Sequence, residues 1–78
     1  MDIFQLQYFL SAAITGNFTM AAAENNISQS SFSKHIMALE NEMGVKLFYR
    51  NRKSISLTPA GERLQKQHYD ILGSSKRM

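Results

Sequence analysis

The sequence predicts a mainly α-helical domain with one small β-hairpin. Apolar residues recur at helical spacing over most of the chain, whereas residues 47–57 form two short strand-like runs around a charged segment. The chain has 78 residues and no cysteine. A single thin apolar core must therefore stabilise it without disulfides or thiolate metal sites. These features speak against a disulfide-rich secreted domain, a zinc finger and a cysteine-dependent enzyme.

Two helices are predicted in the early part of the chain. Apolar positions between residues 3 and 14 have helical spacing, and Gly16 and Asn17 end that helix. A short second helix follows, from residue 20 to about residue 25, with Thr19 as its N-cap. Its consecutive alanines are small enough to let another helix pack closely.

A tight Asn-Asn turn at residues 25–26 leads into a third helix, because Asn tolerates the left-handed conformation that such turns require. Ser28 is the expected N-cap, with Ile27 before it and Phe32 after it at the positions of a hydrophobic staple. Gly44 is the expected end of the helix. The predicted buried stripe of this helix comprises Phe32, Ile36, Leu39 and Met43.

The next stretch is predicted to be a β-hairpin, with strand-like runs at 47–49 and 55–57 and a polar connection between them. Thr58 is the expected N-cap and Pro59 the first residue of a fourth helix. The apolar side of that helix comprises Leu64, His68, Ile71 and Leu72.

Charge is distributed unevenly along the chain. The net charge is +3, and no acidic residue occurs between Glu42 and Glu62. A cluster of one sign produces a focused positive field that suits a polyanion, although a solvated surface loop is the alternative explanation. The bases in this interval are Lys46, Arg50, Arg52 and Lys53.

The first turns of the third helix, on the side away from its apolar stripe, carry hydroxyls, one amide and one cation. Such a surface can enter the major groove of DNA, where Gln reads adenine edges, serines contact bases or phosphates, and the helix amino terminus favours phosphate. Ordinary capping chemistry in an all-α domain is the alternative. The candidate DNA-contacting residues are Ser28, Gln29, Ser30, Ser31, Ser33 and Lys34, with Met37 on the same face. A helix pair of this kind followed by a basic hairpin predicts a winged helix-turn-helix.

Four motifs in unbroken register carry a specific resemblance. They are S-Q-S-x-x-S-K at 28–34, L-E-x-E-x-G at 39–44, L-F-x-R at 47–50 and L-T-x-A-G at 57–61. In this combination the chain resembles the amino-terminal domain of LysR-type bacterial transcriptional regulators over nearly its whole length.

The resemblance implies sequence-specific binding of double-stranded DNA in transcription regulation. Asn25 stands where the family usually has Leu, and His35 where it usually has Gln. The recognition-helix residues that would face DNA are Gln29, Ser30, Ser33 and Lys34. The wing residues that would contact the minor groove or the backbone are chiefly Lys53, with Arg50 and Arg52 nearby.

The resemblance also implies that the fourth helix pairs with its copy in a second chain, so that a homodimer binds an interrupted palindrome. Packing on the chain's own core is the alternative for this helix. A small-molecule effector would bind only to a carboxy-terminal domain that is missing from this chain. We expect a DNA-binding domain at 1–58, with the helix-turn-helix at about 18–43 and the wing at about 46–57, and a linker or dimerisation helix at 59–78. The expected dimerisation residues are Leu64, His68, Ile71 and Leu72.

Other functional classes have less support. No metal-binding motif, Gly-rich phosphate loop or nucleophile signature occurs, so we expect no catalysis, no metal and no cofactor. No apolar run has the length of a membrane span and no signal peptide is recognisable, so we expect a cytoplasmic protein without membrane contact. The main alternative is a small helical module for dimerisation or protein interaction. Salt titration separates it from a DNA-binding domain, because phosphate contacts weaken steeply with salt.

Overall fold

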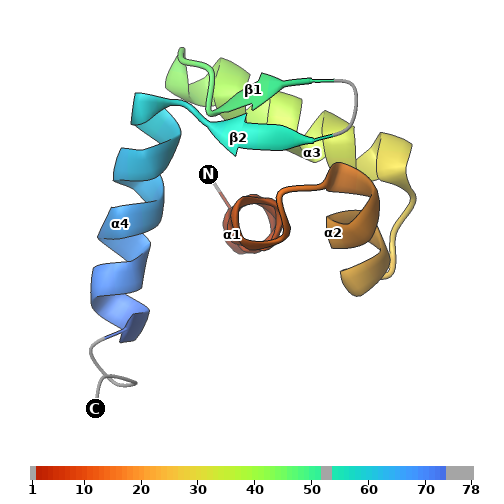
Figure 1. Ribbon diagram of the computed structural model, residues 1–78, viewed down its shortest axis with the longest axis horizontal. Helices are drawn as coiled ribbons and strands as arrows, with labels where there is room; N and C mark the ends of the chain where they lie inside the picture. The colour runs from red at the N-terminus through yellow and green to blue at the C-terminus, as the bar shows by residue number, and fades with distance from the viewer. Residues whose placement is uncertain (1, 52–53, 74–78) are drawn as a thin grey trace.

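Four helices and one antiparallel hairpin make up the fold (Figure 1). The computed structural model describes residues 2–51 and 54–73, with the side chains of the first range and of 54–68. Within these residues, no helix combines the length and the apolar character that crossing a membrane requires. The elements are α1 (Ile3–Thr15), α2 (Phe18–Glu24), α3 (Gln29–Met43), β1 (Phe48–Arg50), β2 (Ile55–Leu57) and α4 (Pro59–Gly73). This confirms the predicted mainly helical winged helix-turn-helix.

The start of α2 differs from the prediction. Asn17, and not Thr19, is the N-cap: its side-chain oxygen accepts a hydrogen bond from the Met20 N–H at 2.9 Å. The helix therefore begins at Phe18. The turn after α2 is as predicted, with Asn26 in the left-handed conformation at a φ of 60°.

The third helix has the predicted ends but not the whole predicted stripe. Ser28 caps it through the Ser31 N–H at 3.1 Å, and Gly44 ends it at a φ of 74°. Its buried apolar residues include Ile36, but Met43 is 40% exposed. The assignment of Met43 to the core was wrong, because the last turn of α3 extends past the centre of the core, where Glu40 takes the inward position.

Aromatic side chains from successive elements form the centre of the core. Phe18 of α2 lies 5.6 Å from Phe32 of α3 and 5.5 Å from Phe48 of β1, measured between ring centroids. Phe9 of α1 lies 5.4 Å from Phe48. Tilted and edge-on contacts at these distances are favourable beyond simple burial of area. The cluster therefore joins α1, α2, α3 and the first strand of the wing.

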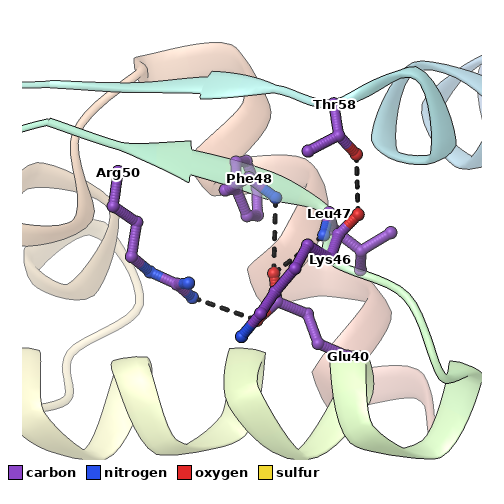
Figure 2. A network of polar contacts seen from close by, with 6 residues as sticks. All are labelled: Glu40, Lys46, Leu47, Phe48, Arg50 and Thr58. Atoms are coloured by element: carbon purple, nitrogen blue, oxygen red, sulfur yellow. Dashed lines mark hydrogen bonds and ion pairs between the residues drawn. The ribbon is translucent and has the colours of Figure 1, made fainter.

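A buried carboxylate attaches the wing to α3 (Figure 2). Glu40 is only 3% exposed, and its Oε2 accepts hydrogen bonds from the backbone N–H groups of Leu47 at 2.8 Å and Phe48 at 3.3 Å. Its Oε1 lies 3.2 Å from Nη2 of Arg50. Because both oxygens have partners, the buried charge is compensated and the start of β1 is fixed on α3.

The same end of the wing is also joined to α4. The strands pair with Tyr49 opposite Ser56. Thr58 follows β2, and its hydroxyl donates to the Lys46 carbonyl at 2.7 Å (Figure 2). The same hydroxyl accepts from the Gly61 N–H at 3.1 Å. A side chain at Gly61 would collide with the carbonyl oxygen of Leu47, so glycine is required for this approach of α4.

The first turns of α4 pack on the chain's own core, whereas its later turns extend away from the other elements (Figure 1). Leu64 is 4% exposed within the single chain and belongs to the core cluster. Leu64 thus follows the alternative of packing on the chain's own core, because the contact at Gly61 brings the next turn of α4 against that core. His68 is half-buried, with its Nδ1 3.2 Å from the Leu64 carbonyl oxygen. The side chains of Ile71 and Leu72 lie outside the described residues.

Polar contacts join α1 to α2 at the position where the related family usually has Leu. The Asn25 side chain donates to the Ala21 carbonyl at 2.7 Å and to the Ser11 hydroxyl at 3.1 Å, and it accepts from Gln7 at 3.0 Å. Ser11 in turn donates to Glu24 at 3.1 Å. Asn25 thus ties the end of α2 to α1 by hydrogen bonds.

We predict that Glu40→Ala lowers the free energy of unfolding by about 3 kcal/mol, because two backbone donors and Arg50 lose their acceptor. Glu40→Gln should cost only about 1 kcal/mol, since the amide oxygen can still accept from the backbone. Urea unfolding followed by circular dichroism measures both. Asn41→Ala, an exposed neighbour on α3, is the control and should change stability by less than about 0.5 kcal/mol. Equal losses in the two Glu40 variants would contradict the role given to the backbone hydrogen bonds.

Candidate nucleic-acid interface

The amino terminus of α3 combines a cap with exposed hydroxyls. The Ser28 hydroxyl accepts from the Ser31 N–H and lies 3.3 Å from the Ser30 hydroxyl. All three serines are exposed. A helix amino terminus carries partial positive charge, and no acid occurs in the first turn of α3. This end of the helix is therefore suited to a phosphate group.

The outward face of α3 is the one that the spacing predicts. Gln29 and Lys34 are exposed, and Ser33, which lines a groove, is half-buried. Met37 continues the same face and is 49% exposed. Lys34 is the one charged side chain between residues 25 and 39. The outward surface of the first turns is therefore polar and positive.

The recognition helix and the wing line a common groove of about 260 Å³. Gln29 and Ser33 of α3 form one side, and Arg50, Asn51 and Ser54 of the wing form the other. The groove brings the polar side of α3 and the tip of the wing together on one side of the molecule. This is the arrangement that a domain needs if helix and wing are to contact one duplex together.

Some of the residues that line this groove were not predicted from the sequence. Asn17 and Thr19, at the start of α2, reach it. Asn17 has the signal of an N-cap, but the sequence analysis assigned it to the end of the preceding helix. Asn51 and Ser54 lie in the wing connection, where the Asn51 N–H donates to the Ser54 carbonyl at 2.9 Å. The sequence pattern does not single out these two residues, because the neighbouring cations dominate that segment.

Arg50 has two partners inside the protein. Its guanidinium pairs with Glu40 and lies 5.3 Å above the ring of Phe18. Its side chain is 34% exposed and lines the groove. Arg50 therefore holds the wing in place, and only part of its guanidinium faces outward. The other two wing candidates, Arg52 and Lys53, lie outside the described residues.

His35 lies on the surface. It is exposed, and its ring centroid is 5.1 Å from that of Tyr8 on α1. This contact joins α3 to α1. It gives His35 a packing role beside the aromatic core.

A family model of bacterial regulatory helix-turn-helix proteins of the lysR family matches residues 3–62. A probable cat1 operon transcriptional activator of Acinetobacter lwoffii is 41% identical over 78 residues, which is 100% of this chain and 26% of that protein. The regulator XapR of Escherichia coli is 42% identical over 71 residues, which is 91% of this chain and 24% of that protein. The chain thus spans about a quarter of the length of these relatives.

Solved structures of related proteins have the same fold. The DNA-binding domain of CbnR, solved in complex with DNA, superimposes with a TM-score of 0.86 at 35% identity, covering 99% of this chain and 88% of that chain. The DNA-binding domain of BenM, solved with catB site 1 DNA, superimposes with a TM-score of 0.86 at 29% identity, covering 100% of this chain and 87% of that chain. Since the family model covers most of the chain and the fold agrees over nearly all of it, this chain belongs to the LysR family of bacterial regulatory helix-turn-helix proteins and contains the winged helix-turn-helix DNA-binding domain of that family.

Proposed function

We propose that this chain binds double-stranded DNA sequence-specifically, as the DNA-binding domain of a transcriptional regulator in the bacterial cytoplasm. In this proposal α3 lies in the major groove and the wing lies on the adjacent minor groove or backbone. The observation that carries the proposal is the common groove, because polar side chains of α3 and of the wing tip line it together. The function is binding, without catalysis.

The proposed roles follow from the chemistry of each side chain. An α-helix with its side chains is about 10–12 Å wide and fits the major groove, which is about 12 Å wide. Gln29 reads a base edge, because an amide offers a donor and an acceptor together. Lys34 neutralises phosphate, since an ammonium group is a point charge without the fork of arginine. Ser30 and Ser33 contact bases or phosphates.

The related structures support the transfer of this function. CbnR and BenM are both represented by DNA-binding domains in complex with DNA, and this chain matches each over at least 99% of its length. The curated relatives are described as a transcriptional activator and as transcriptional regulators. We carry both properties over to this chain as part of the proposal.

We also propose that two copies pair through α4 and bind an interrupted palindrome. Leu64 lies in the core of its own chain, so the pairing surface begins farther along α4, at His68, and continues through Ile71 and Leu72. A small-molecule effector would act on the full-length regulator through a further domain.

Selection of bound sites from random duplex DNA tests the proposed function. The expected product is a two-fold motif with an unspecified centre, because a symmetric dimer presents two identical recognition helices. A single half-site would leave DNA reading intact and contradict dimeric binding. Recovery of no motif would instead favour a protein-interaction module.

We predict that Lys34→Gln flattens the salt dependence of binding to the selected duplex. Each neutralised phosphate contributes about 0.9 to the slope of log K against log salt, so the slope should fall by about that amount for each chain. Lys66→Gln removes the same charge from an exposed position on α4 and is the matched control. Fluorescence anisotropy between about 50 and 200 mM salt measures the slopes. Identical slopes in the two variants would argue against a phosphate contact at Lys34.

We predict that Gln29→Ala relaxes the preference for one or two base pairs in each half-site. For sites with the preferred base, the binding free energy should weaken by about 1–3 kcal/mol. For sites with another base at that position, it should change little. Lys53→Ala should instead weaken binding to all duplexes alike, as expected for a wing cation on the backbone. Competition binding with single-base-pair variants of the site measures both effects. Uniform losses in both variants would contradict this division of roles.

A further inference from the structure

One large apolar side chain interrupts the polar face of α3. Met37 is 49% exposed and lies three residues after Lys34 and four after Ser33. Spacings of three and four residues place these side chains on one side of a helix. Met37 therefore continues the row of side chains that the proposed function places toward DNA.

The fold does not account for an apolar residue at this position. The inward side of α3 is already filled by fully buried Phe32, Ile36 and Leu39. Met37 lies in the middle of α3, so it caps neither end, and it does not belong to the core cluster. Its side chain is unbranched, flexible and polarisable, and such a side chain adapts to an apolar group presented by a binding partner.

The major groove presents one apolar group, the 5-methyl group of thymine. An α-helix rises 1.5 Å per residue, so Met37 lies about 6 Å farther along α3 than Ser33. Successive bases on a strand are about 3.4 Å apart. With α3 lying along the groove, Met37 would face a base about two steps beyond the one nearest Ser33, on the side of α3 that enters the groove.

We propose that Met37 is a specificity-determining residue that packs against the 5-methyl group of a thymine in the major groove. This inference rests on the proposed function, since it requires α3 to lie in that groove. Met37 would thereby recognise a methyl group. A polar residue at this position would instead favour a hydrogen-bonding base edge.

The test removes the methyl group from the DNA and the thioether from the protein in turn. Each thymine of the selected half-site is replaced, one at a time, by deoxyuridine, which pairs in the same way and lacks only the 5-methyl group. Binding of each duplex is then measured for the 78-residue chain, for Met37→Ala and for Met43→Ala. Met43 is the matched control, because it is an exposed methionine of the same helix that lines a different groove with Ala60 and Arg63 of α4.

We expect deoxyuridine at one thymine to weaken binding of the wild-type chain about fourfold, the effect of exposing one methyl group to water. The Met37→Ala variant should bind the thymine and deoxyuridine duplexes equally at that position. The Met43→Ala variant should keep the fourfold difference. Thermal unfolding of Met37→Ala should match that of the wild-type chain, because the side chain lies outside the core.

Four other outcomes overturn the inference, and all but the last leave the proposed function intact. A thymine preference that survives in Met37→Ala would assign the methyl contact to another residue. A selected half-site without thymine, or without sensitivity to deoxyuridine, would exclude the contact. Reduced self-association of Met37→Ala with unchanged base preference would identify this surface as a protein contact. If selection yields no motif at all, the proposed function fails together with the inference.

Discussion

The buried carboxylate of Glu40 is the constraint on which the geometry of this domain depends. Glu40 projects from α3 and accepts hydrogen bonds from two backbone N–H groups at the start of the wing. It also pairs with Arg50, at the end of the first strand. Burying a charge is costly unless both oxygens are satisfied, and here they are. The wing cannot shift on α3 without leaving that charge uncompensated. The recognition helix and the wing are therefore held together as one unit, with the wing tip beside the outward side of α3.

The aromatic core connects that constraint to the rest of the molecule. Phe18 contacts Phe32 and Phe48, and the guanidinium of Arg50 covers its ring. The start of α2, the early part of α3 and the first strand thus meet at one point beneath the groove. A chain of this length buries little apolar surface, so large rings make efficient use of it. The side chains on the outward side of α3 do not contribute to the core and are available for recognition.

The sequence by itself determined the order and ends of nearly all elements. Ser28, Gly44 and the pair Thr58-Pro59 act within one turn of the chain, so their effects do not depend on distant residues. The polar face of α3 was equally predictable, because helical spacing alone decides which side chains share a side. The family resemblance followed from motifs in fixed register, and the match over residues 3–62 confirmed it.

Only the tertiary structure decided which side chains are buried and which pair with one another. The charge of Arg50 is visible in the sequence, but its pairing with a buried acid ten residues earlier on another element is not. Leu64 and Met43 have the same apolar character, yet one is buried and the other exposed, because the approach of α4 and the end of α3 set the limits of the core. The choice of Asn17 over Thr19 as cap likewise depended on where Phe18 had to enter the core. Local chemistry specifies elements, whereas burial and pairing depend on which elements meet in space.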